Sequence, residues 1–169
     1  VEAFDSIIKT ADKIIDIIDS GFDIVMNSFK WWDFKADWFL KDYNQWAGKA
    51  SSMTFPENHD TERFASEYNG DRVKAVCYYA IEAYFCSSIA ITLGFEYGFR
   101  KKIEVTTTSP ADYEEISYDI VEEIRMINEV KEEFKILQED NIINIYDFNN
   151  NNIFSFLKDG RENKEKIFV

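Results

Sequence analysis

Residues suited to acid–base and hydrogen-bonding chemistry gather in two short segments of this 169-residue chain. The segment at 55–65, FPENHDTERFA, holds carboxylates, an amide, an arginine and His59, which is the single histidine of the sequence. The segment at 94–100, GFEYGFR, adds a further carboxylate, a tyrosine and an arginine. Paired carboxylates carry out glycosidic chemistry, and hydrogen bonds to sugar hydroxyls assist it. The two segments therefore predict a carbohydrate site, although clefts for other ligands contain the same residue types.

Two adjacent tryptophans, Trp31 and Trp32, add flat aromatic surface upstream of these segments. An indole ring can pack on the apolar face of a sugar, and it packs equally well in a hydrophobic core. The sequence leaves both interpretations open.

The overall charge excludes several classes of protein. The chain has 19 Lys or Arg and 32 Asp or Glu, which gives a net charge of −13. This sign is wrong for a protein that neutralises nucleic-acid phosphates and for a polybasic membrane anchor. A Ser-His-Asp triad or a multi-histidine zinc site would have to depend on His59 alone. We therefore predict no metal site, no cofactor and no nucleic-acid partner.

The cysteines and the N-terminal sequence bear on cellular location. Cys77 and Cys86 would lie about 13 Å apart on one helix, too far to form a disulfide. We expect both to be buried free thiols, which suggests a reducing compartment. The first residues show no basic segment followed by an apolar one, so we expect no signal peptide and a cytoplasmic protein.

The segments that would position the candidate residues alternate between helix and strand. Helices are predicted at 4–18, 36–47 and 71–87, and short apolar strands at 22–27, 51–55 and 89–93. For the helix at 71–87 we expect a buried face formed by Val73, Val76, Cys77, Ala80, Ile81, Tyr84 and Phe85. This alternation predicts a parallel sheet with crossover helices. The candidate residues follow the predicted strands, at the edge where such sheets bind ligands.

The apolar stretch 75–93 is long enough to raise the alternative of a membrane-spanning helix. It contains one charge, Glu82, in the middle, and it ends in the β-branched run IAIT. We therefore favour a buried helix that leads into a buried strand, and we predict no membrane partner.

The last third of the sequence changes pattern near residue 140. Ser109-Pro110 predicts the start of a helix that extends to about 138, with its acidic side chains on a solvated outer face. Beyond it, alternating apolar residues predict a hairpin at 143–158 with a turn at the asparagines 149–152, and then a third strand at 166–169.

The segment FPENHDTERFA resembles the last signature block of the alpha-amylase family of retaining glycosidases and transglycosylases. In that family the seventh barrel strand ends in an aromatic, a variable stretch and Asn-His-Asp, here at 58–60. The eighth strand then ends in Gly-x-Glu, here at 94–96. The resemblance implies a partial (β/α)8 barrel over 1–139, with about strands six to eight and their helices. The first strands of a β-sandwich C-terminal domain would occupy 140–169.

The same resemblance assigns roles to individual residues. Asp60 would be the acid that stabilises the oxocarbenium-like transition state, and His59 would hydrogen-bond the same sugar. Each also has a structural explanation, because Asp is a common helix N-cap and a lone histidine often lies beside a turn. The remaining candidates for substrate binding are Asn58, Trp31, Trp32, Arg63 and Glu96.

Two of these candidates have clear structural alternatives. Arg63 can pair with Glu57 or Glu62, which we expect to be solvated loop acids. Glu96 is expected to hydrogen-bond loop backbone at the barrel mouth.

We identify no counterpart of the family's strand-four nucleophile block or strand-five Glu block. The sequence therefore predicts a fragment of an enzyme that acts on α-glucosidic bonds of α-glucans or malto-oligosaccharides, by hydrolysis or glycosyl transfer. Alone, the chain is predicted to be inactive, and its partners would be the glucan and the N-terminal part of the barrel. The alternative is a stand-alone, non-catalytic carbohydrate-binding or interaction module.

Overall fold

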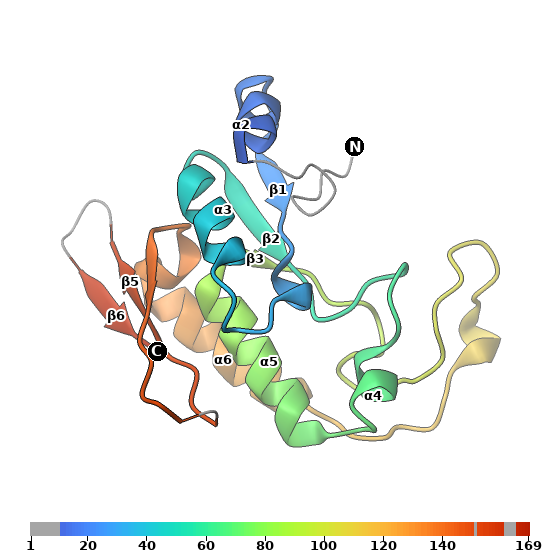
Figure 1. Cartoon of the computed structure of the whole chain (residues 1–169). Coiled ribbons are helices and arrows are strands. Elements are labelled where there is room, and N and C mark those ends of the chain that lie inside the picture. The colour runs from blue at the N-terminus through green and yellow to red at the C-terminus, as the bar shows by residue number, and fades with distance from the viewer. Residues whose placement is uncertain (1–10, 151, 161–164) are drawn as a thin grey trace.

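The computed structural model describes residues 11–150, 152–160 and 165–169. The first part of the predicted helix at 4–18 lies outside these residues. The elements in chain order are α2 Ala11–Asp19, β1 Ile24–Met26, η1 Phe29–Trp31, α3 Trp38–Trp46, β2 Ser51–Thr54, α4 Phe64–Glu67, α5 Arg72–Phe85, β3 Ser88–Ile89, η2 Pro110–Asp112, α6 Val121–Glu133, η3 Lys135–Gln138, β4 Ile143–Ile145, β5 Phe156–Asp159 and β6 Lys166–Phe168 (Figure 1).

The first three strands form a parallel sheet in the order β1-β2-β3, as the alternating pattern predicted. Val25 is fully buried while the adjacent Ile24 is 49% exposed, because successive side chains of a strand point to opposite faces. One face of the sheet is therefore packed and the opposite face carries the more exposed side chains. β3 is shorter than the predicted strand at 89–93, because its partner β2 ends at Thr54 and leaves nothing further to pair with.

Aromatic side chains fill the core on the packed face of this sheet. Phe29 and Phe85 lie at its centre, with ring centroids 5.1 Å apart, and Phe39, Tyr43 and Trp46 of α3 surround them. A second cluster joins α5 to α6, which lie side by side (Figure 1). These clusters hold the strands against the helices and so fix the edge from which the candidate loops emerge.

Asp71 caps the N-terminus of helix α5, because its side chain accepts a hydrogen bond from the backbone N–H of Lys74. The buried face of the helix matches the predicted one only in part. Phe85 is buried, and the other predicted residues that pack against the core, partly buried, are Val76, Ala80, Ile81 and Tyr84. The buried residues that were not predicted are Ala75, Tyr79, Glu82 and Ala83. In contrast, Val73 is 69% exposed and Cys77 is exposed, so the expectation of two buried thiols holds only for Cys86. The helix is apolar on most sides, and its small alanines, which allow close packing, decide which side faces the core.

The stretch 75–93 is a helix followed by a short strand, as favoured from the sequence. Among the helices that the structure describes, none combines the length and the apolar character that a membrane crossing requires.

The predicted continuous helix from 110 to 138 is wrong. A short turn at η2 is followed by an irregular segment, and α6 begins only at Val121. The backbone N–H groups of Ser117 and Ile120 donate to the carbonyls of Tyr97 and Glu96 instead of to helical partners. These long-range bonds hold the segment against the loop after β3.

The C-terminal strands form a small antiparallel sheet in the order β4-β5-β6, as the hairpin pattern predicted. Ile143 and Phe156 of this sheet belong to the same core as α3 and the end of α5. The ring of Phe156 lies 5.3 Å from that of Phe85. Both sheets thus contribute side chains to one apolar core, Val25 from the parallel sheet and Ile143 and Phe156 from the antiparallel one.

Candidate functional site

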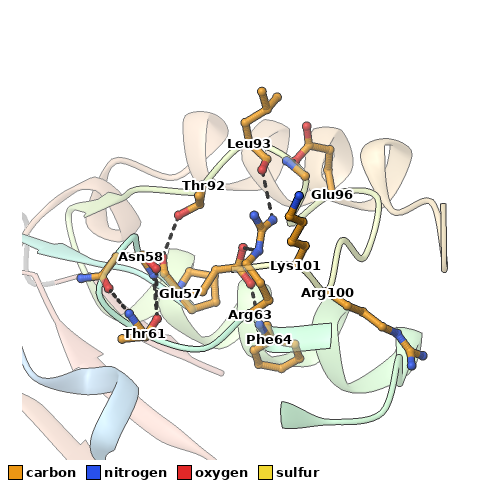
Figure 2. Close-up of polar contacts among 12 residues, drawn as sticks. Glu57, Asn58, Thr61, Arg63, Phe64, Thr92, Leu93, Glu96, Arg100 and Lys101 are labelled. Carbon is orange, nitrogen blue, oxygen red and sulfur yellow. Dashed lines mark hydrogen bonds and ion pairs between the residues drawn. The ribbon is translucent and has the colours of Figure 1, made fainter. Parts of the chain in front are cut away.

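The Asn-His-Asp triplet lies in a tight turn between β2 and α4. Figure 2 shows Asn58 and Thr61 of this turn and the hydrogen bonds between them. The side-chain oxygen of Asn58 accepts hydrogen bonds from the backbone N–H groups of Asp60 and Thr61, each at 3.0 Å. The Thr61 hydroxyl oxygen in turn accepts from the Asn58 N–H at 3.0 Å. This is the way in which an Asn side chain stabilises a turn. Asn58 therefore shapes the loop, and its side-chain oxygen is used within it.

His59 and Asp60 are the exposed members of this turn. Their side chains are 42% and 72% exposed, and His59 Nε2 lies 3.4 Å from Asp60 Oδ2. The Lys102 ammonium donates to the Asp60 backbone carbonyl at 3.3 Å, which leaves the carboxylate open to solution. Both side chains are thus open to solution at the carboxyl end of β2, and their contact with a sugar stays a prediction.

Glu57 and Arg63 form a buried ion pair at the base of the same loop. Arg63 Nε lies 2.7 Å from Glu57 Oε1, and the two side chains are 2% and 1% exposed. Glu57 Oε2 also accepts the backbone N–H of Phe64 at 2.5 Å. Burial raises the pKa of Glu57 to about 7, although Arg63 and the Phe64 N–H act in the opposite direction. The expected pairing of Arg63 is confirmed, but the expectation that Glu57 is solvated is wrong.

The predicted contact of Arg63 with substrate does not fit this burial. Its guanidinium also donates from Nη2 to the carbonyl of Leu93 at 3.0 Å, in the loop after β3. Thr92 in the same loop donates its hydroxyl to the Glu57 carbonyl at 3.1 Å. Arg63 therefore connects two loops, and its side chain is almost fully enclosed.

The Gly-x-Glu segment at 94–96 lies directly beside Arg63. Gly94 has φ +95°, and a Cβ at this position would lie 2.2 Å from the ring of Phe99 and 3.0 Å from Arg63 Nη2. Only glycine accommodates both the backbone conformation and the close approach. Glu96 Oε2 accepts the Gly94 N–H at 2.9 Å, which is the backbone role expected at the barrel mouth.

The two tryptophans after β1 have different surroundings. Trp31 is 50% exposed and meets the ring of Phe55 edge to face at 5.9 Å. Trp32 is 4% exposed and stacks on Phe39 with a centroid distance of 4.9 Å. Trp32 is thus a core residue and offers no free face to a sugar, which corrects its place among the candidates. Trp31 remains a candidate platform.

A cavity of about 260 Å³ lies beside the loop. Arg63, Leu93, Phe99, Lys102 and Tyr113 are among the residues that line it. Its lining combines apolar and aromatic side chains with charged groups of both signs, among them Lys101, Asp112 and Glu114. Within residues 11–150, 152–160 and 165–169, no group of three or more His, Cys, Asp or Glu side chains is arranged to hold a metal ion.

Sequence reasoning missed the residues that support the loop from outside the two segments. Lys30 donates to the carbonyl of Pro56 at 2.8 Å and to Glu67 at 2.9 Å, and so connects the segment after β1 to the loop. Lys30 follows its strand by only a few residues, so its position at the carboxyl edge was the available signal. Thr92 carries no such signal, because threonine is common in strands and loops alike.

Comparisons with known proteins agree with this geometry at the level of the fold. No family model matches the sequence. An alpha-1,4-glucan:maltose-1-phosphate maltosyltransferase of Burkholderia pseudomallei (strain K96243) is 31% identical over 60 residues, which are 36% of this chain and 5% of that protein.

Solved structures match over much more of the chain. The alpha-amylase from H. orenii superposes with a TM-score of 0.72 over 94% of this chain and 40% of its own, at 17% identity. The maltogenic alpha-amylase AmyB from Thermotoga neapolitana gives 0.58 over 90% and 38%, at 18% identity. A trehalose-6-phosphate hydrolase of Bacillus licheniformis gives 0.51 over 88% and 43%, at 15% identity.

The chain thus spans less than half the length of each of these structures. The superposition on the alpha-amylase takes in 94% of this chain, and so nearly all of the parallel sheet, the helices and the small antiparallel sheet that follows them. The resemblance seen in the two signature segments is therefore confirmed for the fold: this chain has the fold of the C-terminal part of an alpha-amylase barrel, followed by a small β-sheet.

Proposed function

We propose that this chain is the C-terminal part of an alpha-amylase-like enzyme that acts on α-glucosidic bonds of α-glucans or malto-oligosaccharides. The observation that carries the proposal is the exposed His59–Asp60 pair at the carboxyl edge of the parallel sheet. The pair has this place in a chain with the fold of alpha-amylases. The similar proteins named above act, by their names, on glucans, maltosyl units or a trehalose phosphate.

In this proposal Asp60 is the catalytic residue of the chain. Its carboxylate accepts hydrogen bonds from sugar hydroxyls, and these bonds strengthen as the ring flattens toward the oxocarbenium-like transition state. The imidazole of His59 contacts the same sugar, and Trp31 supplies an aromatic face at the side of the site. Neither side chain forms or breaks a covalent bond.

The covalent steps require two further carboxyl groups, one as nucleophile and one as general acid. We identify neither in this sequence, so we propose that they belong to a part of the barrel outside this chain. That part is also the partner we propose for the open edge of the sheet at β1. The 169-residue chain alone is then expected to bind a malto-oligosaccharide weakly and to hydrolyse none.

A stand-alone carbohydrate-binding module is the second candidate function. The observation that favours it is that the His59–Asp60 turn is held by contacts within this chain, through Asn58, Glu57 and Arg63. The chain therefore presents the pair without the rest of a barrel.

The test measures binding and turnover of maltoheptaose by the chain. Asp60→Asn is expected to abolish the binding that titration calorimetry or ligand-observed NMR detects. Glu62→Gln, the same change of charge in the same loop, is expected to leave it unaltered. Binding that is indifferent to Asp60→Asn would overturn the proposed site, and turnover by the chain alone would overturn the missing-carboxylate proposal. An Asp block and a Glu block encoded in frame upstream would favour the enzyme over the module.

A further inference from the structure

The His59–Asp60 turn is closed at its base by two residues of opposite charge. Glu57 immediately precedes the turn and Arg63 follows it, so their ion pair brings together the two ends of the 58–62 loop. The Phe64 N–H, which begins α4, donates to the same carboxylate and ties the loop to the helix. The ends of the loop are thus fixed by three groups that belong to the chain itself (Figure 2).

The same ion pair also fixes the loop relative to its neighbour after β3. Arg63 donates to the Leu93 carbonyl, and Thr92 donates to the Glu57 carbonyl. Replacement of Gly94 by any residue with a Cβ would disturb Arg63, since the added atom would lie 3.0 Å from its guanidinium. These contacts extend from the segment at 55–65 to the segment at 94–100, so both segments help to hold the 58–62 loop in place.

A requirement for stability does not explain an ion pair at this place. Removing both charges from water costs more than a buried pair usually regains, and apolar residues of similar size are often as stable or more stable. The burial that raises the pKa of Glu57 reflects this cost. What the pair offers is position, because the planar guanidinium lies against Glu57 through Nε, as an ion pair without an aligned hydrogen bond, and donates to the Leu93 carbonyl through Nη2.

We infer that Glu57 and Arg63 are positioning residues, a clamp that holds the 58–62 loop so that His59 and Asp60 face a bound sugar together. This inference rests on the proposed function of that pair as a sugar site. The clamp touches no substrate. It acts by limiting the conformations of the loop, which reduces the ordering that binding would otherwise require.

The first test observes the loop without any sugar. The backbone amide signals of 58–61 are followed by NMR in the 169-residue chain, where His59 also gives a unique imidazole signal. Glu57→Gln is nearly isosteric and keeps an acceptor for the Phe64 N–H, but it removes the charge. We expect these amides to broaden or split, whereas the matched loop change Glu62→Gln leaves them as single signals. Unchanged amides in Glu57→Gln would overturn the clamp.

Arg63→Lys tests whether the planar guanidinium is needed or whether a positive charge at this position is enough. Lysine keeps the positive charge but lacks the fork that reaches Glu57 and Leu93 together. We expect the same loss of loop order as in Glu57→Gln, with a far-ultraviolet circular dichroism spectrum equal to that of the original chain. Full retention of the single amide signals would show that charge alone suffices and would overturn the inference.

A pH profile tests whether the charge of Glu57 acts on the loop. In a His59→Gln background, which removes the imidazole titration, the amides of Asp60 and Thr61 are expected to shift with a midpoint near 7, where Glu57 takes up a proton. The charged or titratable groups near this carboxyl are Arg63, Lys30, Glu67 and Tyr118. The shift should disappear when Glu57→Gln is added, and a shift that persists would count against the clamp.

The final arm joins the clamp to the sugar site. With maltoheptaose as the probe, Glu57→Gln is expected to weaken binding about tenfold through loss of loop order. If the original chain binds no maltoheptaose, the proposed function fails while the amide and pH arms still decide the clamp. If the chain binds and Glu57→Gln binds equally well, the clamp fails while the sugar site stands.

Discussion

Glu82 is a carboxyl group buried without compensation. It is fully buried on α5, and within the described part of the chain neither of its oxygens has a hydrogen-bond partner. Burial raises its pKa well above the ordinary value of 4.5, and the charge of Lys30 only partly offsets this. Because the folded state favours the protonated form, the stability from this group is full below pH 4.5 and is lost as the pH rises.

We therefore predict that Glu82→Leu raises the free energy of unfolding by about 1–3 kcal/mol at about pH 8. The gain should be smaller at about pH 5, because more of the unfolded chains then carry a protonated Glu82, and folding requires less proton uptake. Urea denaturation at both pH values measures the difference. The exposed control Glu62→Leu should change stability by less than about 0.5 kcal/mol. An equal gain at both pH values would contradict the titration of Glu82.

The adjacent residues Trp31 and Trp32 allow the same substitution to be compared at an exposed and at a buried position. Trp32→Ala removes a core ring and should cost about 3–5 kcal/mol in denaturant unfolding. Trp31→Ala removes a half-exposed ring, so it should cost much less stability while weakening maltoheptaose binding, measured by calorimetry. Equal stability losses for the two would contradict their different burial, and unchanged sugar binding in Trp31→Ala would remove Trp31 from the proposed site.

At the scale of elements, the end of α5 contacts two lysines, the partly buried Lys131 and the fully buried Lys158. Lys131 of α6 donates to the carbonyls of Ala83, Cys86 and Leu137, and Lys158 of β5 donates to those of Tyr84 and Phe85. Positive charge at a helix C-terminus is favourable, and the last carbonyls need donors. Burial lowers the pKa of both lysines to about 8. Through Lys158, the small antiparallel sheet thus supplies hydrogen-bond donors to the last carbonyls of α5.

We predict that Lys158→Met destabilises the chain by about 1–3 kcal/mol, because the buried carbonyl of Phe85 loses its donor. Lys166→Met on β6, where the lysine is exposed and pairs with Asp159, should change stability by less than about 0.5 kcal/mol. Thermal and urea unfolding of the two variants provide the measurement. Equal effects would show that the contact at the end of α5 contributes little.

The elements also show why only part of the structure could be predicted. Helix α3, the parallel sheet and the C-terminal hairpin follow from local periodicity, alternation of elements and turns, and they were predicted. The break at 113–120 depends on bonds to the distant carbonyls of Glu96 and Tyr97, for which local periodicity has no signal. The candidate loop could be located because its motif is local in the sequence. The burial of Glu57 depends on contacts with Arg63 and the loop after β3, which local sequence does not signal, so it was missed.

At the scale of the whole molecule, the parallel sheet has two outer strands, β1 and β3, that pair on one side only among the residues that the structure describes. Ile24 at the β1 edge is 49% exposed, and Ile91 and Leu93 beyond β3 are 41% and 61% exposed. An unpaired strand edge beside apolar side chains promotes association between chains. In a complete barrel such edges would be paired.

We therefore predict that the chain alone forms oligomers or aggregates, which size-exclusion chromatography with light scattering detects. Ile24→Lys on the open edge should reduce this association, since a charge on an edge strand disfavours pairing. Val73→Lys on the outer side of α5 is the matched control and should not reduce it. A monodisperse monomer that unfolds cooperatively would instead favour the stand-alone module.

The apolar contact between Phe85 and Phe156 has a consequence for exchanging parts between related proteins. Asp140, just beyond the predicted domain boundary, also accepts hydrogen bonds from the hydroxyl of Tyr43 and the backbone of Ser52. A recombination crossover placed between residues 139 and 140 would therefore transplant only half of an interface. Chimaeras that keep their native activity should be those in which the C-terminal strands are inherited together with α3 and α5.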